Sequence, residues 1–319
     1  MPAVLHGLDI GGTKIGVCIG DADGCVLASR RFATDHATDP AEILDRALGE
    51  LEQLSAQLGT GSAAALGVAC PGPYHAGRQR FLDPPNMPRW HGFALGEFLR
   101  ARVAGPAAAM NDANAAVLAE WYWGAGVGFR NVVYFTMSTG MGAGFILDGR
   151  LYQGTDGFAA EIGHLPLEAD GPVGFGRRGS VEGYLSGPGI VQVAEAERRV
   201  CRQTGEATAL DAVADGLSAA NVCAAASAGD PAARRAIDRC AMQLGRLMAI
   251  LTDVLNPELF VLGTIGSAYP ELFIPRATVV LHEQAIRHSA EIVRVVPSGL
   301  TDPGSQQALA VARGIAASA

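Results

Sequence analysis

The sequence is poor in positive charge for its length. Its 319 residues carry 24 Lys and Arg against 32 Asp and Glu, which gives a formal net charge of −8. A protein that binds nucleic acid in general needs a clustered surplus of basic residues to neutralise phosphates. This balance argues against a nucleic-acid partner, although a local site for a small anion remains compatible with it.

Long hydrophobic runs are also missing, although 49% of the residues are hydrophobic. No run approaches the roughly 18 apolar residues of a membrane helix. The start, "MPAVLHGLDI", has no basic segment followed by an apolar one. We therefore expect no membrane partner and a cytoplasmic location.

The six cysteines form no close pair. They are spread between Cys18 and Cys240 without a CxxC motif. Disulfide frameworks and cysteine-rich metal sites depend on such spacing, so we expect free, buried thiols.

What the sequence does contain is a repeated pattern of strand, turn and strand. Residues 4–10 and 15–20 flank "GGTK", and residues 25–33 are typical of a third strand. Residues 131–137 lead into "STGMGAG" and then into the strand-like "FILDGRLYQG". The repetition suggests an internal duplication.

The remaining pattern alternates helices with buried strands. Helices are predicted from Asp39-Pro40 onward and over residues 112–123, 232–255 and 306–317, and strands over residues 64–70, 107–110 and 259–263. Residues 166–180 form a glycine-rich loop.

The glycine turns have two interpretations. In "GGTK", glycines let backbone N–H groups approach an anion, and Thr13 and Lys14 add a hydroxyl and a charge, yet the same residues suit a plain hairpin. The second turn, residues 138–144, favours a phosphate site, because two turns can hold one phosphate chain from opposite sides. A third turn, "LGTIG" (262–266), fits either a nucleoside or an ordinary strand-to-helix connection.

These turns lack the spacing of two common nucleotide motifs. Neither GxxxxGK[ST] before a helix nor GxGxxG between a strand and a helix is present, and "GGTK" precedes another strand. A dinucleotide-dependent oxidoreductase is therefore disfavoured.

Several polar residues are candidates for a site. Asp112 in "NDAN" lies where a strand meets a helix, so it is either an N-cap or a carboxylate that accepts a proton from a substrate hydroxyl. The other candidates share side chains that hydrogen-bond a polyhydroxylated ligand, and they are Asn86, Asn111, Glu161, His164 and Glu182.

Taken together, these motifs resemble the sugar-kinase branch of the ROK family (repressors, open reading frames and kinases), within the actin/hexokinase-like ATPases. The resemblance spans nearly the whole chain. It rests on the order and spacing of "LDIGGTK", "GVACPGP", "NMPRW", "NDAN", "STGMGAG", "AEIGHLPL" and "GRRGSVEGYLSGPGI".

The resemblance implies an α/β fold with two ribonuclease H-like domains and a cleft between them. The first domain would comprise residues 1–112 completed by a C-terminal helix (303–319), and the second residues 113–302. It also implies ATP and Mg²⁺ as cofactors and a homodimer.

The resemblance further assigns roles to individual residues. Asp112 would be the general base, and Asn111, Glu161, His164, Glu182 and Asn86 would bind the sugar. The residues facing the phosphates and Mg²⁺ would be Asp9, Gly11, Gly12, Thr13, Lys14, Thr139 and Gly140. Gly263 and Gly266 would line the adenosine pocket.

One stretch departs from the family pattern. Members often carry CxCGxxGCxE, whose cysteines bind a structural zinc together with the histidine of ExGH, whereas this chain has "VGFGRRGSVE". Val173, Phe175 and Ser180 replace the thiolates that such a zinc site needs. We therefore expect no structural zinc, and a loop that is either ordered by packing of Val173 and Phe175 or mobile.

The sequence favours ATP-dependent phosphorylation of a hexose or an N-acetylhexosamine. A non-catalytic sugar sensor and a fructokinase-like specificity are the alternatives. A repressor of the same family would carry a helix-turn-helix region before the first phosphate motif, which only seven residues precede here.

Overall fold

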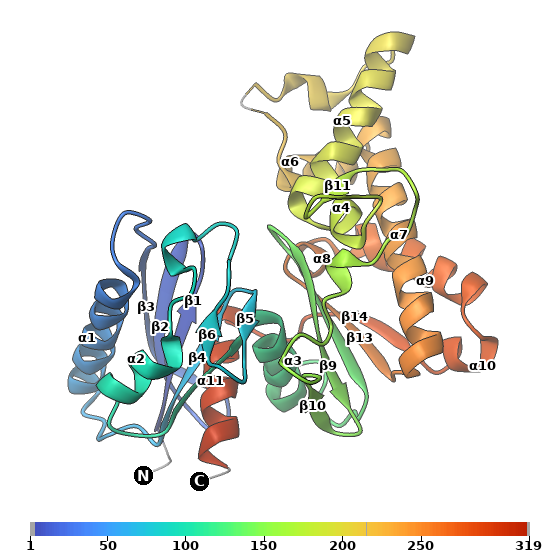
Figure 1. Cartoon of the computed structure of the whole chain (residues 1–319). Helices are drawn as coiled ribbons and strands as arrows, with labels where there is room; N and C mark the ends of the chain where they lie inside the picture. The colour runs from blue at the N-terminus through green and yellow to red at the C-terminus, as the bar shows by residue number, and fades with distance from the viewer. Residues whose placement is uncertain (1–3, 215, 318–319) are drawn as a thin grey trace. The chain divides into compact units, whose positions relative to one another are not determined.

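The chain forms two compact units in a computed structural model that describes residues 4–214 and 216–317 (Figure 1). The first unit comprises the chain up to Gly128, Leu151–Ala159 and the segment from Gly299 onward, and the second comprises Phe129–Arg150 and Ala160–Ser298. The α/β fold class is confirmed. The domain limits expected from the sequence stay a prediction.

The first unit is built on a five-stranded sheet with the order β3-β2-β1-β4-β7. Strands β1, β2 and β3 are antiparallel neighbours, and β4 and β7 run parallel to β1. The elements of this unit are β1 (Val4–Ile10), β2 (Lys14–Asp21), β3 (Val26–Ala33), α1 (Pro40–Leu58), β4 (Ala65–Cys70), β5 (Tyr74–His75), β6 (Arg80–Phe81), η1 (Pro88–Trp90), α2 (Leu95–Arg102), β7 (Ala107–Asn111), α3 (Asp112–Trp123) and α11 (Pro303–Ala316).

Helix α1 forms where the sequence predicts it. The Asp39 carboxylate accepts a hydrogen bond from Ala41 N at 2.9 Å, and Pro40 occupies the first helical position. Apolar residues at helical spacing, among them Leu44 and Leu51, are buried against the sheet. The helix ends at Gly59, whose φ of 63° suits glycine.

The other face of this sheet is covered by α11 at very short range. Gly67 of β4 lies against the helix backbone, so a Cβ there would overlap Ala308 O and Ala312 N. Ala308 and Ala312 are fully buried. Small residues on both sides let the helix and the strand approach backbone to backbone.

The second unit contains a sheet of the same strand order, β10-β9-β8-β13-β14. Strands β8 and β9 are antiparallel, and β13 runs parallel to both β8 and β14. The shared order agrees with an internal duplication. The further elements are β8 (Val132–Met137), β9 (Met141–Leu147), β10 (Arg150–Tyr152), η2 (Ile162–His164), β11 (Val173–Gly174), β12 (Arg177–Arg178), α4 (Val181–Leu185), α5 (Gly187–Thr204), η3 (Ala209–Ala212), α6 (Ala219–Ser227), α7 (Pro231–Leu255), β13 (Leu259–Gly263), α8 (Thr264–Ala268), α9 (Pro270–Gln284), α10 (Arg287–Ala290) and β14 (Arg294–Pro297).

The second glycine turn is shorter than predicted. Strand β9 begins at Met141, because Gly142 and Gly144 pair with Thr136 and Tyr134 of β8. The turn is therefore confined to residues 138–140.

All six cysteines are free thiols, as predicted, and all except Cys25 are buried. Within residues 4–214 and 216–317, no helix has the length and apolar character needed to cross a membrane.

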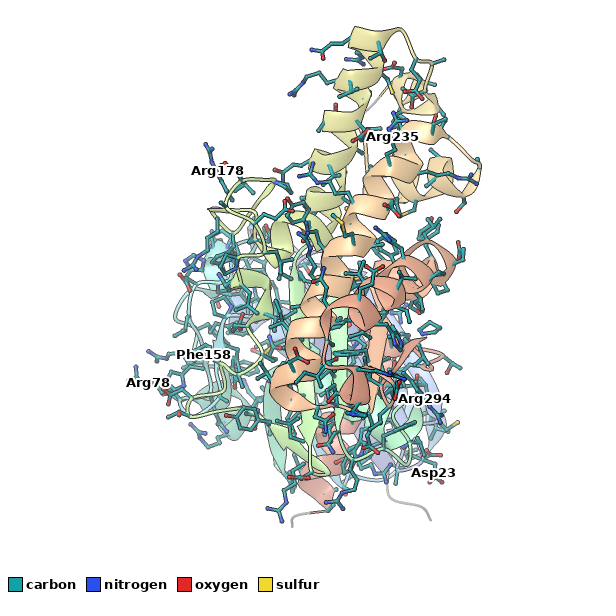
Figure 2. The ribbon with its side chains drawn as sticks, turned by 90° about the vertical axis from the view of Figure 1, so that its right-hand side faces the viewer. Asp23, Arg78, Phe158, Arg178, Arg235 and Arg294 are labelled. Atoms are coloured by element: carbon teal, nitrogen blue, oxygen red, sulfur yellow. The ribbon has the colours of Figure 1, made fainter. Side chains whose placement is uncertain are left out.

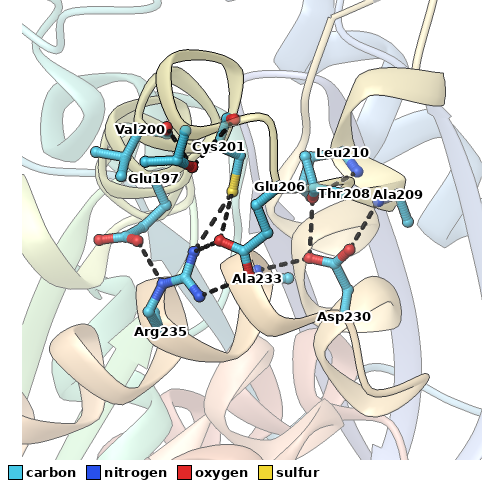
Figure 3. A network of polar contacts seen from close by, with 11 residues as sticks. Glu197, Val200, Cys201, Glu206, Thr208, Ala209, Leu210, Asp230, Ala233 and Arg235 are labelled. Atoms are coloured by element: carbon cyan, nitrogen blue, oxygen red, sulfur yellow. Dashed lines mark hydrogen bonds and ion pairs between the residues drawn. The ribbon is translucent and has the colours of Figure 1, made fainter.

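The start of α7 is fixed by a polar network in the second unit (Figure 3). The Asp230 carboxylate accepts hydrogen bonds from Ala233 N at 2.9 Å, Ala209 N at 2.7 Å and the Thr208 hydroxyl at 3.0 Å. Partial burial acts to raise the pKa of Asp230, but these hydrogen bonds outweigh it, so the pKa lies below its ordinary value. Because the folded pKa is lowered, the ionised group stabilises the fold at neutral pH, and this contribution is lost as the pH falls through that pKa.

The variant Asp230→Ala is expected to lower the free energy of unfolding by about 1–2 kcal/mol at neutral pH, since it removes an N-cap. The difference from the wild type should begin to shrink below about pH 4, where the unfolded chain takes up its proton, and should vanish as the pH falls through the lowered pKa of the folded carboxylate. Urea unfolding at several pH values measures both effects. The control is Asp170→Ala, whose side chain is 90% exposed and which should change stability by less than about 0.5 kcal/mol. An unchanged difference across the pH range would contradict the assignment.

Candidate active site

The first glycine turn connects β1 to β2 and is closed by backbone hydrogen bonds. Gly11 N donates to Lys14 O at 3.0 Å, and the Thr34 hydroxyl donates to Gly11 O at 2.7 Å. Thr13 and Lys14 are exposed beyond this closed base. The turn is thus a hairpin that also presents a hydroxyl and an ammonium group to solvent. A plain hairpin and a phosphate site, the two interpretations from the sequence, are therefore compatible.

Two further predicted residues lie near this edge of the first sheet. A Cβ on Gly12 would lie 3.7 Å from Cβ of Asn86, which is exposed. Asn111 ends β7 beside Cys70 of β4, and its amide nitrogen lies 3.1 Å from a Cβ built on Gly72. The "CPGP" loop therefore lies next to Asn111.

The N-cap of α3 is Asn111 rather than Asp112. The Asn111 side-chain oxygen accepts hydrogen bonds from Ala113 N at 3.0 Å and Asn114 N at 3.4 Å. Asp112 is the first residue of the helix, and its carboxylate accepts from Ala113 N at 2.8 Å. The capping role that the sequence left open for Asp112 is filled by Asn111. The role of Asp112 as a proton acceptor stays a prediction.

Asp9 lies close enough to Asp112 for their charges to interact. Burial and, after it, the charge of Asp112 raise the pKa of Asp9 to about 7, although Lys14 and Arg31 act in the opposite direction. Asp302 also raises it. Burial is thus the main reason for the raised pKa of Asp9, and the carboxylates of Asp112 and Asp302 add negative charge beside it.

This negative charge suits a divalent cation. Mg²⁺ prefers oxygen ligands and is commonly held by one or two carboxylates, with water and phosphate oxygens completing its shell. In the described ranges, no group of three or more His, Cys, Asp or Glu side chains is placed to bind one metal ion. A magnesium ion held by Asp9 would thus need its remaining ligands from a nucleotide and water.

Asp302 was not among the residues predicted from the sequence. It immediately precedes α11 and forms an ion pair with Arg31 at 2.6 Å. The sequence feature that marks Asp302 is the dipeptide Asp302-Pro303, which matches the helix start at Asp39-Pro40. The helical pattern starts only at Gln306 and the family resemblance implies a helix from residue 303, so neither includes Asp302.

In the second unit, Glu182 connects the second glycine turn with the predicted sugar residues. Its Oε2 accepts a hydrogen bond from Met141 N at 3.2 Å and would lie 2.9 Å from a Cβ on Gly140. A Cβ on Gly163, between Glu161 and His164, would lie 3.6 Å from Cβ of Glu182. The exposed Thr139 stands at the tip of the same turn.

Glu161 immediately precedes the short helix η2, His164 is the last residue of that helix, and the two side chains interact electrostatically. Desolvation raises the pKa of Glu161 above its ordinary value, the nearby His164 lowers it and the charge of Glu182 raises it. The side chain nevertheless retains contact with solvent. These residues therefore form a compact polar group within the second unit.

The turn after β13 is shaped by packing. A Cβ on Gly263 would overlap the Tyr134 hydroxyl, and one on Gly266 would lie 2.9 Å from Met137 Sδ. Thr264 between them has a φ of 49°, which a β-branched residue rarely adopts, and its hydroxyl donates to Met137 O. The glycines have steric reasons to be present, and their proximity to adenosine stays a prediction. Thr264 was not predicted, since its role depends on a contact between distant segments.

The whole-chain comparison defines the class of protein. The profile of the ROK family matches residues 5–312, so the chain belongs to the ROK family, as the motifs predicted.

Its relatives include sugar kinases of two kinds. The glucokinase of Streptomyces coelicolor is 33% identical over 260 residues, which cover 81% of this chain and 80% of that protein. The N-acetylmannosamine kinase of Escherichia coli O127:H6 is 31% identical over 263 residues, 82% of this chain and 83% of that protein. The crystal structure of a ROK family glucokinase from Streptomyces griseus in complex with glucose and AMPPNP matches with a TM-score of 0.81 at 29% identity, covering 98% of this chain and 100% of that one.

Proposed function

We propose that this protein is an ATP-dependent sugar kinase that transfers the γ-phosphoryl group of ATP to a hydroxyl of a hexose or an N-acetylhexosamine. The observation that carries the proposal is the position of Glu182. The Glu182 carboxylate accepts a hydrogen bond from Met141 N, directly after the second glycine turn. The Cβ of Glu182 lies 3.6 Å from where a Cβ on Gly163, between Glu161 and His164, would stand. The turn proposed to bind phosphate and the residues proposed to bind sugar thus lie next to each other within one unit, and the relatives support the same activity.

Each predicted residue then has a chemical task. Asp112 accepts the proton of the attacking sugar hydroxyl. Hydrogen bonds from Asn111, Glu161, His164 and Glu182, with Asn86 as a further contact, orient the sugar. The turns that contain Gly11, Gly12 and Thr13, and Thr139 and Gly140, bind the phosphates through backbone N–H groups.

Two groups of the first unit would offset the negative charge of the phosphates. Lys14 contributes an ammonium group, and Asp9 would hold Mg²⁺, which supplies charge neutralisation when it is bound. Gly263 and Gly266 would line the adenosine pocket. We further propose that the protein acts in the cytoplasm as a homodimer, without a nucleic-acid or membrane partner.

A coupled assay of ADP release over a panel of sugars tests this proposal. The panel contains glucose, N-acetylglucosamine, N-acetylmannosamine, allose and fructose. We expect ADP release that depends on glucose or an N-acetylhexosamine and exceeds the rate without sugar at least about a hundredfold. A preference for fructose would replace the proposed specificity by that of a fructokinase. Sugar binding in calorimetry without any ADP release would identify a sensor instead of a kinase.

A further inference from the structure

Phe175 occupies a backbone conformation that disfavours its side chain. It forms, with Gly176, the two-residue connection between β11 and β12, and the φ values of these two residues are 49° and 75°. Two-residue hairpin turns with two positive φ values favour Asn, Asp and Gly, because a large side chain is strained there. A phenylalanine that persists at such a position calls for a functional explanation.

The hydrophobic core does not supply that explanation. The Phe175 side chain is 54% exposed. Its ring instead lies against the imidazole of His164, with ring centroids 4.7 Å apart and planes inclined at 80°. This is the edge-to-face geometry that aromatic pairs prefer. The strained residue therefore contacts one of the residues proposed to bind the sugar.

The base of the hairpin is held firmly. Ser180 is fully buried, its hydroxyl lies 3.3 Å from Gly174 O and Arg177 O, and it accepts a hydrogen bond from Gly183 N at 3.1 Å. Gln192 of α5 bonds both backbone groups of Val173, at 2.9 and 2.8 Å. The hairpin is thus anchored through α4, which carries Glu182, and through α5.

The ordering predicted for this loop is corrected accordingly. Val173 remains 44% exposed and does not order the loop by packing, because polar bonds at Ser180 and Gln192 do so. Arg178, on the second strand of the hairpin, points away into solvent (Figure 2). The Phe175 ring, in contrast, meets His164.

We propose that Phe175 is a positioning residue that fixes the orientation of the His164 imidazole for sugar binding, in place of a metal. The three positions where the family resemblance implies zinc thiolates hold Val173, Phe175 and Ser180, which offer no thiolate, so the residues present do not fit that metal. A hydroxyl anchors the hairpin and an aromatic ring restrains the histidine. The inference rests on the proposed sugar-kinase function.

Steady-state kinetics of the full chain test this role. Phe175→Ala should raise the KM for the sugar about three- to tenfold, with kcat within about twofold of the wild type and the KM for ATP unchanged. Phe175→Tyr retains the ring and should restore the wild-type KM. Val173→Ala is the matched control, because it truncates another exposed side chain of the same hairpin and should leave the sugar KM unchanged.

A second variant separates positioning from a purely structural role. Phe175→Gly relieves the strained turn, so it should unfold at a higher temperature than Phe175→Ala while showing the same rise in sugar KM. If both variants keep the wild-type sugar KM, the positioning role is wrong.

A failure of the proposed sugar-kinase function can be told apart from a failure of the positioning role. It would appear as a wild-type protein without sugar-dependent ADP release. Proton NMR then still tests the contact between Phe175 and His164. Loss of the Phe175 ring should shift the proton resonances of the His164 imidazole, which the variant His164→Gln assigns. Unshifted resonances would overturn the inference whatever the activity.

Discussion

Replacing Asp112 by asparagine is expected to reduce kcat for sugar phosphorylation by about a hundredfold to ten-thousandfold, the range typical of a lost general base. The amide has nearly the shape of the carboxylate and can still accept the hydrogen bond from Ala113 N, which the carboxylate accepts at 2.8 Å. The start of α3 should therefore persist, since Asn111 remains its cap. What the variant loses is the capacity to take a proton from the sugar hydroxyl.

Calorimetry measures the affinity of the variant for the sugar, and ADP release measures its kcat. The affinity for the sugar should change by less than about threefold, so the loss should fall on kcat. The matched control is Glu42→Gln, which removes an exposed carboxylate from the first turn of α1 and reports any effect of helix-terminal charge. Near-normal turnover of Asp112→Asn would remove this residue from the catalytic role.

The second large effect expected is on stability. Gly67→Ala should lower the free energy of unfolding by about 3 kcal/mol or more, because the added methyl group meets backbone atoms of α11, Ala308 O and Ala312 N, which cannot rotate away. The Cβ of Val311, 2.9 Å away, closes the remaining space. Urea unfolding of the whole chain measures this loss.

Gly49→Ala provides the matched control for this change. Gly49 lies inside α1, and a Cβ there would have no neighbour within 4 Å. The same substitution should therefore raise stability by about 0.5–1 kcal/mol through helix propensity. A Gly67→Ala variant as stable as the wild type would show that Gly67 tolerates a side chain and that the close packing of α11 is overstated.

Local signals allowed much of the fold to be predicted from the sequence. The hairpin around "GGTK" and the helix after Asp39-Pro40 depend on residues adjacent in the chain, and both are confirmed. The sequence offered Asp112 as a possible cap of α3, whereas Asn111 is the cap; both residue types cap helices well, and the two are neighbours.

Contacts between distant segments lay beyond such signals. The start of β9 at Met141 depends on pairing with β8, which overrides the preference of its glycines for turns. The contact between Phe175 and His164, and the bond from Thr264 to Met137, join residues that the fold brings together. The roles of the site residues stay predictions, since they concern ligands rather than packing.

The position of α11 has a consequence for biosynthesis. The glycine-bearing face of the first sheet is covered by a helix that is translated only after the entire second unit. While the nascent chain emerges, β1 and β4 lack their cover, so the earliest-made sheet is completed late. The first unit should thus depend on protection by chaperones until the ribosome has released α11.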